Sequence, residues 1–154
     1  MLKEGDLAPD ATVQTADGGS ASLFSQVKAP LVLYFYPKDD TPGCTREAQD
    51  FTSLASEFAA AGLSVIGISK DTPRKHAAFI EKHGLKIGLL TDADGSVCEA
   101  YGTWIEKSLY GRKYMGIDRA TFLIGPDRRI VRIWRKVKVA GHAEEVLGVA
   151  KTLK

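Results

Sequence analysis

Cysteine is scarce in this sequence: Cys44 and Cys98 are the only two in 154 residues. Secreted domains held together by disulfides carry more, so that class is excluded and a reducing cytoplasm is the expected location. The chain also lacks any apolar run of the ~18–20 residues that a membrane helix needs. Its acidic start, MLKEGDLAPD, is typical of neither a secretory signal nor a transit peptide. We therefore expect no membrane association.

The chain also has few glycines and prolines, and it has no large excess of charge of one sign. The chain has 15 Gly and 6 Pro among its 154 residues. Their combined share is well below the roughly 25–30% that is typical of disordered or low-complexity chains. Its 21 basic and 19 acidic residues leave a net charge of +2, which gives no overall reason to expect a nucleic acid or an anionic membrane as partner. A chain of 154 residues fits one domain, which we place at residues 1–154.

The apolar pattern alternates between short buried runs and helical spacing. This alternation predicts an α/β fold, with a mixed central β-sheet flanked by helices and an N-terminal β-hairpin around Gly18-Gly19. The hairpin strands are expected at residues 11–15 and 21–24. The other expected strands are residues 31–36, 63–69, 87–90, 121–124 and 130–134. The expected helices are residues 41–62, 73–83, 96–101 and 142–153.

The segment from Tyr34 to Phe51 holds the most informative chemistry. A buried strand ends at Pro37, a polar loop follows, and Thr41 and Pro42 are a good N-cap and a good first helical residue. Cys44 then falls at the third helical position. The free N–H groups and the positive dipole end of a helix favour an anion there. A thiolate is such an anion and is the reactive form of cysteine, so Cys44 is a candidate nucleophile.

A helix end alone is too weak to ionise a thiol. An unperturbed thiol is only ~3% ionised at pH 7, and lowering its pKa to ~6 needs about 3.4 kcal/mol. A helix terminus supplies about 0.3–1 kcal/mol, up to ~2 when partly buried. A second cation is required, and arginine suits the task because it does not lose its proton. Spacing does not show which arginine of this sequence lies close.

Several ordered motifs resemble the peroxiredoxins, the thiol peroxidases of the thioredoxin-like fold. Pro37, Thr41 and Cys44 match the P-x-x-x-T-x-x-C motif of that family, and TPGCTRE is similar to its PrxQ branch, also called bacterioferritin comigratory proteins. Further similar segments are GDLAPD, GISKDTP, VCEAYGTW and DRATFLIGPDRRI. The resemblance implies a thioredoxin-like fold and the reduction of hydrogen peroxide and organic hydroperoxides, with no cofactor.

The resemblance also implies a role for each catalytic residue. Cys44 attacks the O–O bond and becomes a sulfenic acid. The hydroxyl of Thr41 and the backbone N–H of Cys44 hold the peroxide, and Pro37 shields the sulfur from water. Arg119 is the missing cation, which stabilises the thiolate and the charge that develops as the bond breaks.

This sequence departs from many PrxQ members at the position of the resolving cysteine. Gln49 stands where a cysteine follows five residues after Cys44, and the helix expected at residues 73–83 has none. We therefore expect a one-cysteine mechanism, with thioredoxin or another small thiol as the reductant and a monomer as the main species, a weak dimer being the alternative. Cys98 is expected to pack as a small apolar residue. A Cys44–Cys98 disulfide remains the alternative, and it needs Cα atoms within roughly 7 Å or local unfolding.

A basic stretch, Arg128–Lys138, favours a different class of function. With Trp134 between its basic residues it is typical of a nucleic-acid-binding hairpin. An edge strand with outward arginines and lysines gives the same pattern, because such strands use charge to prevent aggregation. We prefer the edge strand and expect no nucleic acid as partner. A dithiol oxidoreductase is disfavoured because Thr41 stands where its C-x-x-C motif needs a cysteine.

The remaining polar residues predict no further site. Asp39 and Asp40 are adjacent loop carboxylates, which we expect to be solvated rather than catalytic. His76 and His83 lie on one expected helix, roughly 10 Å apart along its axis, too far to share a metal. His142 stands alone, so no metal site is predicted.

Overall fold

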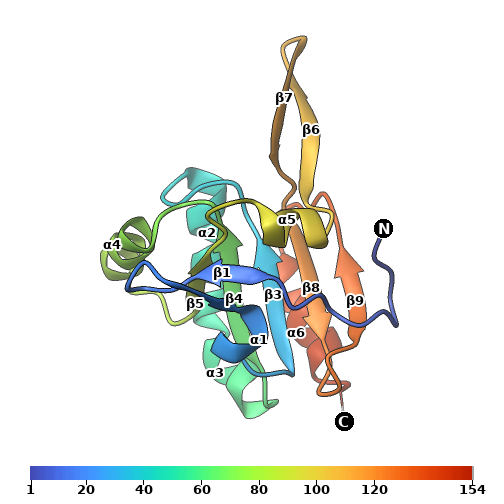
Figure 1. The fold of residues 1–154 in the computed structure, drawn as a ribbon. Helices are drawn as coiled ribbons and strands as arrows, with labels where there is room; N and C mark the ends of the chain where they lie inside the picture. The colour runs from blue at the N-terminus through green and yellow to red at the C-terminus, as the bar shows by residue number, and fades with distance from the viewer. Residues whose placement is uncertain (154) are drawn as a thin grey trace.

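The computed structural model describes residues 1–153 and is built on a seven-stranded mixed sheet in the order β2-β1-β5-β4-β3-β8-β9 (Figure 1). The parallel centre consists of β3 (Leu31–Phe35), β4 (Ser64–Ser69) and β5 (Gly88–Thr91). Antiparallel strands flank it: β1 (Thr12–Gln14), β2 (Ser20–Ser22), β8 (Ala120–Ile124) and β9 (Ile130–Trp134). The predicted mixed sheet and N-terminal hairpin are confirmed.

Helices cover both faces of this sheet, so successive residues of β3 point into different cores. Leu31, Leu33 and Phe35 face one core, and Val32 and Tyr34 face the other. The first core is covered by α1 (Leu23–Gln26) and α5 (Ser96–Ala100). The second is covered by α2 (Pro42–Ser53), α3 (Ala55–Ala60), α4 (Pro73–His83) and α6 (His142–Ala150).

The pairing of β3 with β8 decides which distant residues meet. The two strands are antiparallel, and Phe35 at the end of β3 pairs with Ala120 at the start of β8. The loop that leaves β3 toward α2 therefore begins beside Arg119, the residue just before β8. In this way the sheet joins two segments that are far apart in the sequence.

Three predicted elements need correction. The helix expected at residues 41–62 is interrupted at Leu54, which leaves helical geometry at φ −104° and ψ 3° and separates α2 from α3. Ser53 Oγ donates to Gln49 O one turn earlier, a bond that favours bending of a helix. The second hairpin strand stops at Ser22, because the next four residues form α1. The C-terminal helix ends at Ala150 rather than at residue 153.

The prediction missed a second hairpin, formed by β6 (Trp104–Leu109) and β7 (Arg112–Ile117). It forms a separate two-stranded sheet and projects away from the body of the molecule (Figure 1). Tyr110 and Gly111 make its turn, both with positive φ. A tyrosine at such a position is unusual, which explains why the pattern gave no turn signal.

The basic stretch contains β9, which pairs with β8 in a hairpin and lies at the sheet edge. All four of its arginines contact the protein itself: Arg128 lies over the ring of Phe24, and Arg129 donates to Gly5 O. Arg135 donates to the carbonyls of Tyr101 and Gly102, and Arg132 lies over the ring of Trp134 at 5.2 Å. These contacts favour the edge-strand interpretation. Among residues 1–153, no helix is long and apolar enough to cross a membrane.

Candidate active site

Cys44 lies in the first turn of α2, at the third helical position that the sequence predicts. Its side chain is buried, with 2% of its surface exposed, against the core that α2 covers. The first helical bond runs from Thr45 N to Thr41 O, which leaves the N–H of Cys44 outside the helical ladder. The sulfur therefore sits at the positive end of a helix, beside a backbone donor.

Arg119 supplies the cation that the helix end lacks. Its Nη2 donates to Cys44 Sγ at 3.4 Å, and its Nη1 donates to Glu47 Oε1 at 2.7 Å. Burial acts to lower the pKa of Arg119, but Glu47 and Cys44 outweigh it and raise that pKa above its usual value. Gly43 allows this approach, because a Cβ there would lie 3.2 Å from Arg119 Nη2. The guanidinium is thus held between a sulfur and a carboxylate.

Glu47 is a site residue that the sequence prediction missed. It lies one turn after Cys44 on the same face of α2 and is 1% exposed. Burial raises its pKa to about 7, although Arg119 acts in the opposite direction. Within residues 1–153 its second oxygen, Oε2, and the hydroxyl of Tyr34 are buried without a hydrogen-bond partner. The available signal was its place one helical turn after Cys44, on the same face of the expected helix.

The raised pKa of Glu47 predicts a pH-dependent stability. The unfolded chain loses this proton near pH 4.5 and the folded chain only near pH 7. The free energy of unfolding should therefore fall as pH rises through this window, by about 3 kcal/mol. Urea unfolding of wild type and Glu47→Gln, at a series of pH values, measures the difference. Glu57→Gln, on the exposed side of α3, is the control, and a wild-type minus Glu47→Gln difference independent of pH would contradict the assignment.

Thr41 and Pro37 lie in the loop between β3 and α2. Thr41 is the N-cap residue, as predicted, but its hydroxyl does not cap the helix; it donates to Lys38 O at 2.9 Å. Pro37 is exposed at the start of the loop. The structure thus places Thr41 three residues before Cys44, with its hydroxyl oriented by the loop backbone.

Cys98 belongs to the other face of the sheet. It is fully buried in the core covered by α1 and α5, whereas Cys44 lies in the core covered by α2. Burial, followed by the neighbouring Asp92 carboxylate, raises the pKa of the Cys98 thiol to about 12. The same carboxylate accepts the N–H groups of Val97 and Cys98 at 3.0 and 2.9 Å. These contacts fit the predicted packing role.

The projecting hairpin carries a second cation that interacts electrostatically with the site. Lys107 in β6 is half-buried, and burial lowers its pKa, while Asp118 and Cys44 act to raise it. The sequence prediction missed Lys107 because it missed the hairpin. The positive charge in contact with the sulfur thus comes from the helix end and Arg119, and Lys107 adds a smaller electrostatic effect.

The expectation for Asp39 is wrong. Its side chain is 5% exposed and accepts hydrogen bonds from the Tyr36 hydroxyl and from His76. Asp40 is exposed, as expected, and pairs with Lys82 and His83. Within residues 1–153, no three His, Cys, Asp or Glu side chains gather in a way that could hold a metal ion.

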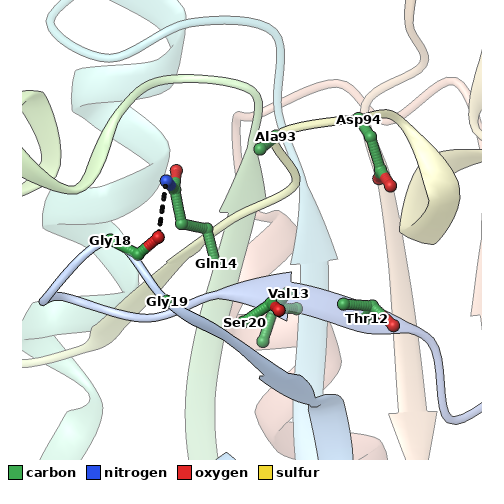
Figure 2. A pocket seen from close by; sticks show the side chains of 8 residues that line it. All are labelled: Thr12, Val13, Gln14, Gly18, Gly19, Ser20, Ala93 and Asp94. Carbon is green, nitrogen blue, oxygen red and sulfur yellow. Dashed lines mark hydrogen bonds between the residues drawn. The ribbon is translucent and has the colours of Figure 1, made fainter.

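A surface hollow beside the N-terminal hairpin lies outside this site (Figure 2). It is formed mainly by small and polar residues, and Gln14 Nε2 donates to Gly18 O across its rim. None of the residues around Cys44 lines it. Its lining residues are Thr12, Val13, Gln14, Gly18, Gly19, Ser20, Ala93 and Asp94.

The family model and the similar sequences all indicate the same protein family. Residues 5–133 match the model of the AhpC/TSA family. The chain is 46% identical over 147 residues to a putative peroxiredoxin Bcp of Coxiella burnetii, covering 96% of this chain and 97% of that one. It is 43% identical over 152 residues to peroxiredoxin Bcp of Bacillus subtilis, covering 99% and 97%.

Similar solved structures indicate the same family as the similar sequences. A structure of PrxQ from Xylella fastidiosa superposes with a TM-score of 0.88 at 39% identity, over 98% of this chain and 96% of that one. The bacterioferritin comigratory protein of Xanthomonas campestris gives a TM-score of 0.84 at 41% identity, over 95% of each chain. That protein was described for its alkyl peroxide reduction activity. The predicted thioredoxin-like fold is confirmed by these neighbours.

Proposed function

Because this chain belongs to the AhpC/TSA family and is a thiol peroxidase of the Bcp/PrxQ type, we propose that it works through a sulfenic acid on Cys44, which an external thiol reduces. The observation that carries the proposal is the bond from Arg119 Nη2 to Cys44 Sγ at the N-terminus of α2. A thiolate is the nucleophile required, and here it has a fixed cation and a helix end.

The reaction proceeds in two steps. The thiolate sulfur of Cys44 attacks the terminal peroxide oxygen, an S–O bond forms, and the O–O bond breaks. The departing alkoxide or hydroxide takes a proton and leaves as alcohol or water. An external thiolate then attacks the sulfenic sulfur, water leaves, and a second thiol releases Cys44 as the product disulfide forms.

Arg119 assists the first step because it is already in position. Its fork holds Sγ with one nitrogen and Glu47 with the other, so the guanidinium does not have to reorient as charge moves onto the peroxide. We propose that Thr41 and the N–H of Cys44 hold the peroxide on the other side. Pro37 keeps its proposed shielding role.

The position of the second cysteine supports a one-cysteine cycle. Cys44 and Cys98 lie in cores on opposite faces of the sheet, so a disulfide between them would have to pass through β3 and its neighbours. The raised pKa of Cys98 also makes it a poor attacking thiol. We therefore propose thioredoxin or a small thiol as the reductant.

Substitution of Cys98 tests the one-cysteine cycle. Cys98→Ser should keep at least about half of the wild-type turnover with dithiothreitol, because an external thiol reduces Cys44 directly. Peroxide consumption over several turnovers is the measurement, with hydrogen peroxide and cumene hydroperoxide compared as substrates. Loss of turnover while Cys44 still becomes oxidised would instead assign resolution to Cys98.

The monomeric state, the cytoplasmic location and the absence of a nucleic-acid partner stay predictions. Peroxide consumption is expected to change little with salt, whereas binding of phosphate backbones weakens steeply as salt rises.

A further inference from the structure

A buried polar cluster lies beside the active-site loop and has no part in the mechanism above. Asp39, in the middle of that loop, accepts from Tyr36 Oη at 2.5 Å and lies 2.6 Å from His76 Nδ1. Tyr36 directly follows β3, and His76 belongs to α4. All three side chains are buried. A carboxylate is rarely buried unless it is paired. The bonds to Tyr36 and His76 therefore explain how Asp39 can be buried in this loop.

The surroundings of His76 fix its hydrogen-bond roles. Its Nδ1 faces the Asp39 carboxylate, and its Nε2 lies 3.1 Å from the carbonyl oxygen of Leu90 in β5. The carboxylate and the carbonyl are both acceptors, so the imidazole is suited to donate to either of them. The ring thus lies between a buried carboxylate and a backbone carbonyl. Removing one partner of a buried ion pair destabilises the folded state, because the remaining charge is left uncompensated.

The backbone of Asp39 is held as well. Its N–H donates to Asp71 Oδ2 at 2.8 Å, and that oxygen also accepts from Ser69 Oγ at 2.6 Å. The loop is therefore attached to the end of β4 through its backbone and to α4 through its carboxylate. Two residues later the chain reaches Thr41, the N-cap of the helix that carries Cys44.

We propose that Asp39 and His76 are positioning residues, which hold the β3–α2 loop closed over Cys44 and so set Thr41 for peroxide binding. The inference rests on the proposed sulfenic-acid cycle. Cys44 is 2% exposed. An attacking external thiol is larger than a small peroxide, so we expect the second step to need a more open loop than the first. The same anchor that favours oxidation of Cys44 therefore opposes reduction of the sulfenic acid, and loosening it should change the two steps in opposite directions.

The test is Asp39→Asn in a Cys98→Ser background, where Cys44 is the only thiol. We expect the rate constant for oxidation of Cys44 by hydrogen peroxide to fall about tenfold, measured by rapid quenching and intact mass. We also expect dimedone to label the sulfenic acid about threefold faster, because the loop opens more often. Asp40→Asn is the matched control: Asp40 is the next residue and pairs with the same helix, but at the surface, so both rates should stay unchanged.

Equal falls of both rates, or no change in either, would overturn the proposal. Tyr36→Phe provides a second variant if Asp39→Asn does not fold; it removes one bond to the carboxylate and should shift both rates in the same directions by smaller factors. If the Cys98→Ser parent forms no dimedone adduct at all, the sulfenic-acid proposal fails. If the parent forms it and Asp39→Asn behaves like the parent, only the loop anchor is wrong.

Discussion

Cys44→Ser is expected to lower the rate of peroxide reduction about a thousandfold or more. A serine hydroxyl stays protonated at neutral pH, so neither Arg119 nor the helix end can convert it into a nucleophile. A thousandfold loss corresponds to about 4 kcal/mol of barrier. Peroxide consumption with excess dithiothreitol measures the effect.

The fold should tolerate this change, because the side chain keeps nearly its shape in the first turn of α2. Thermal unfolding of Cys44→Ser is therefore the control, together with the activity of Cys98→Ser, which changes the same residue type in the other core. A Cys44→Ser variant that still turns over peroxide would place the nucleophile elsewhere.

Arg119→Lys should also be far from conservative. The planar fork of Arg119 reaches Cys44 Sγ and Glu47 Oε1 at once, whereas a lysine ammonium is a single point charge on a flexible stem. We expect the rate constant for oxidation of Cys44 to fall at least about tenfold, or about 1.4 kcal/mol. Single-turnover oxidation by hydrogen peroxide isolates this step from reduction by the thiol.

Arg46→Lys is the matched control for Arg119→Lys. Arg46 lies in the same helix as Cys44, but its side chain is exposed and pairs with Asp50 at 4.0 Å. Its substitution should leave the rate constant unchanged. Equal rate constants for Arg119→Lys and wild type would show that the helix end and Lys107 suffice for the thiolate.

Local patterns predicted the part of the site that is local in sequence. Pro42 at the helix start placed Cys44 in the first turn of α2, where the structure has it. Arg119 came only from the family resemblance, because its closeness to Cys44 depends on the antiparallel pairing of β3 with β8, which no local pattern contains. Glu47 was missed for a related reason: its partner, Arg119, lies 72 residues away.

The two loop aspartates also show that local sequence cannot predict contacts with distant segments. Adjacent Asp39 and Asp40 look alike in the sequence, yet α4 buries the first against His76 and leaves the second at the surface. Propensity could not separate them, because the difference is set by which side of the loop α4 covers. The interruption at Leu54 and the turn at Tyr110 likewise depend on backbone angles that the residue pattern did not indicate.

The most direct test of the central claim is intact mass spectrometry after one equivalent of hydrogen peroxide, without reductant. The account predicts a gain of one oxygen on Cys44, which an external thiol converts to a mixed disulfide and excess peroxide drives to the sulfinic acid. Loss of two hydrogens, with a Cys44–Cys98 peptide after digestion, would contradict the one-cysteine mechanism. A mass change that persists in Cys44→Ser would contradict the assignment of the peroxidatic residue itself.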